Sequence, residues 1–134
     1  MIEDKRATFY LAPTFDHASS LGCHLIDKTR SDRLTTRNTQ RNMDAYANKA
    51  YSAIYTLDTE QKPMSPIEAF RRARQFAPAA GDYWLSQLEL VTMNTLRELF
   101  SYLPLDRISP IAVEFAIALL DINRARLLSL QEEA

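Results

Sequence analysis

Hydrophobic residues recur at intervals of three and four over much of the chain, the pattern of helices with one buried face. One such stripe begins near Met43, and we expect its apolar side chains, like Trp84 further along, to lie in the core. Polar residues 123–126 interrupt the last stripe and supply donors for loop carbonyls or a neighbouring segment. The expected helices cover residues 39–54, 66–77, 82–91, 94–103 and 110–132. The third and fourth ranges are either one continuous helix or two helices that are separated near Thr92.

Serine and proline residues mark several helix ends. Ser65 and Ser109 each precede a proline, an order typical of an N-cap residue and the first helical position. Glu68, three residues after Ser65, predicts a capping box. Pro78 and Pro104 are expected to end the helices before them, because proline cannot donate the backbone hydrogen bond that a helix interior needs.

The first part of the chain has a different pattern. Residues 7–12 are rich in β-formers and predict one strand, which Pro13 ends. A single strand does not form a sheet. We therefore expect it to pair either with the strand-like residues 23–26 or with partners outside this chain.

These elements predict a mainly α fold class, a short β element followed by about five helices. The chain has 134 residues, enough for one domain and too few for two ordinary ones. Residues 1–134 are therefore expected to form a single domain.

Composition narrows the function classes. A net charge of −1 gives no bulk attraction to nucleic acid, so direct nucleic-acid binding is not expected. The single cysteine, Cys23, cannot form an internal disulfide, and the charged residues after Met1 are unlike a signal peptide. Since no apolar run has the length of a membrane span, we expect a cytoplasmic protein without a membrane partner. The two glycines, Gly22 and Gly81, are too few for a glycine-rich phosphate-binding loop.

Four arginines, Arg30, Arg33, Arg37 and Arg41, recur at three- and four-residue intervals. On a helix they would form one positive stripe. Such a stripe is most often a solvated face. The alternative is a surface for a phosphate group, an acidic substrate or a partner, because guanidinium groups bind these anions well.

Asp16 follows the predicted strand directly after Phe15, where a carboxylate can point into a cleft and bind a metal. By spacing, a lone aspartate here is more often a turn or N-cap residue. The residues around it are more specific. Residues 11–22 read Leu-Ala-Pro-Thr-Phe-Asp-His-Ala-Ser-Ser-Leu-Gly.

This stretch resembles the C-terminal domain of HipA-like serine/threonine kinases, in which an L-x-P-x-[FY]-D element follows the catalytic loop. The resemblance implies that Asp16 is the aspartate that binds the magnesium of Mg-ATP, so Mg²⁺ and ATP are the implied cofactors. It also implies the helical part of a kinase C-terminal lobe. The similarity continues through residues 63–67, 104–109 and 122–128.

Family members supply a base and a second metal ligand from a D-x-x-x-x-N loop shortly before this aspartate. The fifteen residues before Asp16 hold no asparagine, so this loop, the nucleotide-binding lysine and the phosphate loop are absent. We therefore expect a C-terminal fragment that is inactive by itself and that needs the missing N-terminal kinase part or a split partner chain. The family also implies toxin–antitoxin function and a HipB-like antitoxin as a possible partner.

A second interpretation stays open, a non-catalytic helical module for protein–protein interaction. A weaker third one is a nucleic-acid binder that uses the four arginines, for which affinity would fall steeply with salt. If the chain is a fragment, we expect an exposed strand edge and an uncovered apolar face.

Overall fold

The computed structural model describes residues 2–3, 9–10, 20–56, 61–104 and 106–133. These residues are mainly helical, as predicted, and no described helix is long and apolar enough to cross a membrane. In chain order the helices are α1 (Asp27–Thr35), α2 (Met43–Ala47), α3 (Pro66–Phe76), α4 (Pro78–Glu89), α5 (Met93–Ser101), α6 (Pro110–Leu128) and the 3-10 helix η2 (Ser129–Glu133).

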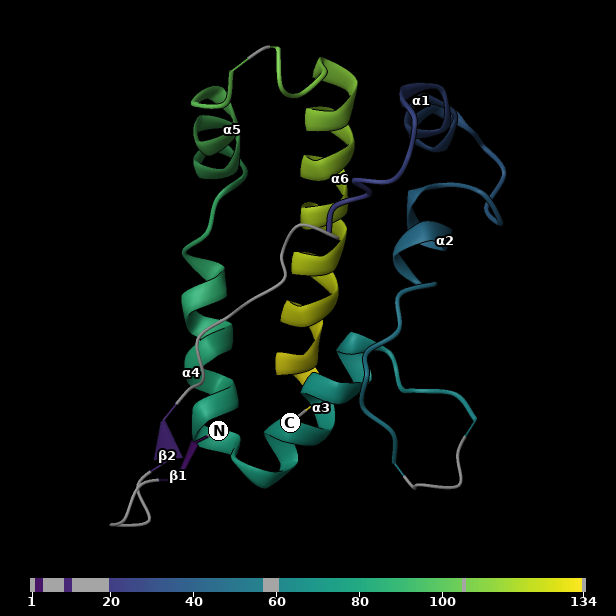
Figure 1. The fold of residues 1–134 in the computed structure, drawn as a ribbon. Helices are drawn as coiled ribbons and strands as arrows, with labels where there is room; N and C mark the ends of the chain where they lie inside the picture. Colours follow the sequence, from purple (N-terminus) through teal and green to yellow (C-terminus); the bar gives the residue numbers. More distant parts are fainter. Residues whose placement is uncertain (1, 4–8, 11–19, 57–60, 105, 134) are drawn as a thin grey trace.

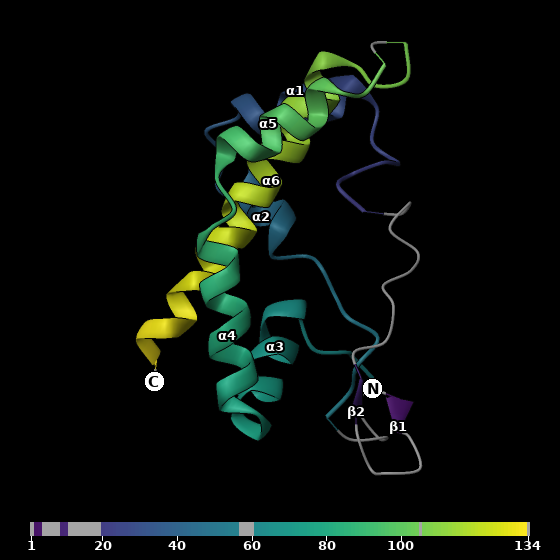
Figure 2. The same ribbon diagram turned by 90° about the vertical axis from the view of Figure 1, so that its left-hand side faces the viewer.

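Helix α6 is the axis of the fold. Helices α1, α2, α4 and α5 all contact it, and α3 packs against α4. In Figure 1, α4 and α5 lie along one side of α6, whereas α1 and α2 lie along the other. Figure 2 shows α4 and α5 following α6 along its length. The longest helix therefore joins the two halves of the helical body.

Two serines cap helices as predicted. Ser65 Oγ accepts a hydrogen bond from the Glu68 backbone N–H at 3.1 Å, and Ser109 Oγ accepts one from Ala112 at 3.2 Å. Each satisfies a backbone donor that the first helical turn leaves unpaired. The structure differs from the predicted capping box in the role of Glu68. Its carboxylate pairs with Arg71 and Arg72 along its own helix.

Several helix bounds differ from the prediction. The helix expected over residues 39–54 is limited to α2, since the backbone of Ser52 and Ile54 bonds instead to Met64. The helix before Pro78 ends at Phe76, as predicted, but the next helix begins at Pro78 and not at residue 82. Pro78 occupies the first turn of α4, where its missing N–H costs nothing. Near Thr92 there are two helices, and Thr92 caps the second by accepting from Thr95 N–H at 3.1 Å.

The described β structure consists of two short strands, β1 (Ile2–Glu3) and β2 (Phe9–Tyr10), which pair antiparallel. The predicted strand over residues 7–12 is represented only by β2, its other residues lying outside the described chain. The strand expected at residues 23–26 is wrong. Residues 21–24 form a turn, in which Leu21 and Gly22 have φ angles of 54° and 71°.

Phe115 of α6 is completely buried and forms the centre of the core. Met43 and Ala47 of α2 pack against it, and the Tyr46 ring meets it edge-on at 5.2 Å between centroids. Gly22 covers another side, so closely that a Cβ there would lie 2.6 Å from Phe115 Cε1.

Many large hydrophobic side chains remain exposed. Phe76 is 90% exposed and Trp84 is 51% exposed, so the expectation that Trp84 belongs to the core is wrong. Trp84 instead borders an apolar cavity of about 310 Å³ between α3, α4 and α6. The other large exposed hydrophobic residues that the structure describes are Ile26, Tyr51, Ile54, Tyr55, Tyr83, Leu90, Leu99, Tyr102 and Leu103.

Gly22→Ala should destabilise the protein by about 2–4 kcal/mol, because alanine is strained at positive φ and its Cβ meets the Phe115 ring. Urea denaturation followed by circular dichroism measures this change. Cys23→Ala is the control, since that side chain is exposed, and it should change stability by less than about 0.5 kcal/mol. Equal stability of the two variants would contradict the close Gly22–Phe115 packing.

Candidate functional site

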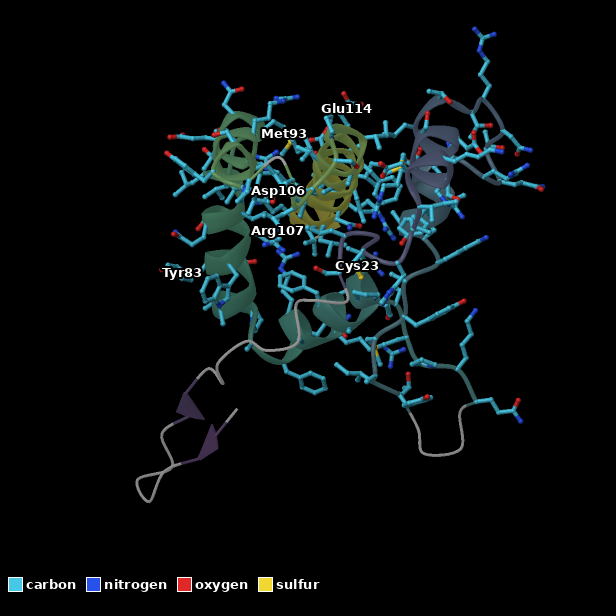
Figure 3. The ribbon with its side chains drawn as sticks, turned by 45° about the horizontal axis from the view of Figure 1, so that its top comes forward. Cys23, Tyr83, Met93, Asp106, Arg107 and Glu114 are labelled. Atoms are coloured by element: carbon cyan, nitrogen blue, oxygen red, sulfur yellow. The ribbon has the colours of Figure 1, made fainter. Side chains whose placement is uncertain are left out.

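A cavity of about 500 Å³ lies where the segment after Asp16 joins the helical body. Ser20, Leu21 and Cys23 form one wall, and the opposite walls come from α1, α5 and the start of α6. Figure 3 labels two of the lining residues, Cys23 and Arg107, near the middle of the view. The remaining lining residues are Asp27, Arg30, Phe100, Ile108, Ser109, Ala112 and Ala116.

Asp16 itself lies outside the described residues. Among the described residues no group of three or more His, Cys, Asp or Glu side chains could hold a metal ion. The cavity is a candidate site because its lining begins at Ser20, just after Asp16 in the sequence.

A polar network fixes one wall of the cavity. Asp27 Oδ1 accepts hydrogen bonds from Ser109 Oγ at 2.9 Å and from Arg30 Nη1 at 2.5 Å. Arg30 Nη2 donates to the backbone carbonyls of Gly22 at 3.1 Å and Cys23 at 3.4 Å. One network therefore joins α1, the first turn of α6 and the segment that comes from Asp16.

The same contacts set the acidity of Asp27. The hydrogen bond from Ser109 and, next, that from Arg30 lower the pKa of the Asp27 carboxyl below its ordinary value. Both donors stabilise the charged form of the carboxylate. Asp27 therefore remains ionised and keeps Arg30 in place at neutral pH.

The four arginines do not form one helical stripe. Helix α1 ends at Thr35, so Arg37 and Arg41 lie beyond it. Arg30, whose side chain is only 13% exposed, is engaged by Asp27 and by backbone carbonyls. Arg33 donates to the Arg41 carbonyl at 3.2 Å, and Arg37 is exposed.

Sequence reasoning missed the pairing of Asp27 with Ser109. The Ser109 cap was predicted, but these residues are 82 positions apart. Nothing in a local pattern indicates that the first residue of one helix meets the N-cap of another. The predicted donors in residues 123–126 are confirmed, since Arg124 donates to the carbonyls of Leu88 and Glu89 at the end of α4.

Comparison with known proteins gave no match, either to a family model, to a curated protein or to a solved structure. The site therefore has to be interpreted from its own residues.

Asp27→Asn should lower stability at neutral pH, because an amide cannot form the charge-assisted bond to Arg30. The folded pKa of Asp27 lies below the unfolded value near 3.8. Its stabilisation is therefore fully present above that value and is lost as the pH falls through the folded pKa. Urea midpoints of the two proteins should differ at about pH 7, and the difference should be smaller at a pH below 3.8.

The control for this series is Asp121→Asn, on an exposed position of α6 for which the described residues provide no hydrogen bond or ion pair. Its midpoint should follow that of the unmodified protein at both pH values. A gap between Asp27→Asn and the unmodified protein that persists unchanged at low pH would show that the carboxylate charge is not the cause.

Proposed function

We propose that the chain is the C-terminal, magnesium-binding part of a HipA-like protein serine/threonine kinase. The observation that carries the proposal is the sequence of residues 11–22, in which Asp16 matches the metal-binding aspartate of that family. The reaction would be ATP-dependent phosphoryl transfer of the toxin–antitoxin type. By this proposal the chain is inactive in isolation, because the base, the second metal ligand and the phosphate loop come from elsewhere.

The number of oxygen ligands that this chain supplies limits its role in magnesium binding. Magnesium takes octahedral oxygen coordination, and Asp16 can supply one or two of those ligands. When bound, the ion would neutralise charge on the transferred phosphoryl group. The network of Asp27, Arg30 and Ser109 would hold the segment that follows Asp16 against the helical body.

The exposed hydrophobic residues support a role as part of a larger assembly. Phe76, Tyr102 and Leu90 are each more exposed than half, although large apolar side chains are usually buried. Aromatic side chains such as Phe76 and Tyr102 are enriched at interfaces with other proteins. Contact with the missing kinase part would account for the exposure of these side chains.

The same exposure favours a second candidate function, a non-catalytic helical module that binds another protein such as a HipB-like antitoxin. This module would need no metal. Asp16 would then be a turn or capping residue, and its loss would affect only stability.

The test begins with the DNA directly upstream of the Met1 codon. An in-frame extension that encodes D-x-x-x-x-N and a phosphate loop would be expressed together with this chain and assayed for phosphorylation with Mg-ATP. Asp16→Asn should lower the rate by at least about 100-fold, since loss even of a residue that supports a metal ligand costs about 10–100-fold. Asp106→Asn, at a side chain 76% exposed, should leave the rate unchanged.

Equal activity of Asp16→Asn and Asp106→Asn would contradict the metal-binding role. A stop codon upstream, with no neighbouring gene that supplies the missing parts, would favour the interaction module. Phosphorylation by this chain in isolation, abolished by Asp16→Asn, would contradict the proposed division of the active site.

A further inference from the structure

A second polar cavity of about 410 Å³ lies between the end of α1 and the loop that leads to α2. It contains two of the four predicted arginines, Arg33 and Arg41, although the spacing alone placed all four together. The other lining residues are Thr29, Asp32, Thr35 and Thr36. Ligand-binding cavities commonly start at about 300 Å³, so this one can admit a small ligand.

Arg33 is held in place by the rest of the fold. Its Nη1 donates to the backbone carbonyl of Arg41 at 3.2 Å, and its guanidinium carbon lies 4.8 Å from the centre of the Tyr46 ring. Tyr46 in turn packs against the buried Phe115. A guanidinium group fixed in this way loses little conformational freedom when it binds an anion.

Donor capacity remains at both arginines. No described residue forms a hydrogen bond or ion pair with Arg33 Nη2 or with the guanidinium group of Arg41, and Arg33 Nε is buried without a partner. Asp32 also lines the cavity but forms no ion pair with either arginine among the described residues. Arg30, by contrast, is already neutralised by Asp27.

We propose that this cavity binds a phosphate group, carried either by a small monoester or by the free ion. Two guanidinium groups and the hydroxyls of Thr29 and Thr36 offer more donors than one carboxylate ligand can accept, whereas a phosphate group has three strong acceptor oxygens. The third lining hydroxyl, that of Thr35, already donates to the Ser31 carbonyl. The positive charges of Arg33 and Arg41 outnumber the single negative charge of Asp32. The proposal goes beyond the kinase assignment and does not depend on Asp16.

The experiment titrates the full chain with inorganic phosphate, O-phosphoserine and acetate, and follows backbone amide shifts by NMR. Both phosphate probes should saturate and shift the amides of residues 29–41, and acetate should bind at least tenfold more weakly. If inorganic phosphate binds as tightly as phosphoserine, the ligand of the cavity is the free phosphate ion. If phosphoserine binds more tightly, the ligand is an esterified phosphate. Either result supports the site.

Three variants test the assignment of residues. Arg41→Ala should weaken phosphate binding by about tenfold or more, the usual effect of losing a hydrogen bond to a charged group. It should fold normally, because Arg33 bonds to the backbone carbonyl of Arg41 and not to its side chain. Arg37→Ala, an arginine in the same segment that does not line the cavity, should change binding by less than about twofold. Asp32→Asn should strengthen binding, because it removes a like charge.

Four results would overturn the proposal. They are the absence of saturable phosphate binding, equal affinity for acetate, an equal loss in Arg37→Ala and Arg41→Ala, and weaker binding by Asp32→Asn. Binding of a short single-stranded oligonucleotide more tightly than phosphoserine would assign the arginines to nucleic acid instead.

Discussion

The packing of Phe115 is the constraint on which the described structure depends. This ring is completely buried, with α2 on one side and the Gly22 turn on another. Loss of a buried phenylalanine typically costs about 3–5 kcal/mol, a large fraction of the 5–15 kcal/mol that stabilises a domain. Since few other side chains are fully buried among the described residues, one ring fixes how the first half of the chain meets α6.

Both candidate sites follow from this packing. The positive φ of Gly22 turns the chain over the Phe115 ring and presents the Gly22 and Cys23 carbonyls to Arg30. That contact holds residues 20–23 at the cavity that the first turn of α6 also lines. Tyr46, which contacts the Phe115 ring edge-on, holds Arg33 at the cavity between α1 and the loop to α2. The core thus determines where the polar groups lie, and the polar groups determine what can bind.

Local signals predicted the features that local chemistry controls. Ser65 and Ser109 lie at helix starts because each hydroxyl can satisfy a backbone donor within its own turn. Thr92 caps α5 in the same way, but the sequence left open whether a helix begins there. Trp84 was misplaced because a helical stripe indicates which side chains share a face, but not whether another element covers that face. The start of α4 at Pro78 was missed, although the end of α3 before it was predicted, because proline is compatible with the start of one helix as well as the end of another.

The two arginines of α1 show why charge spacing does not predict a binding surface. Arg30 and Arg33 are three residues apart and share a helix face. Arg30 lies one turn after Asp27, whose carboxylate also accepts from Ser109, so its charge is used to join two helices. Arg33 lies in the last turn, where the chain offers a carbonyl and an aromatic ring but no carboxylate partner among the described residues. The same side chain is structural where the fold supplies an acid, and it is available to an external anion where the fold supplies none.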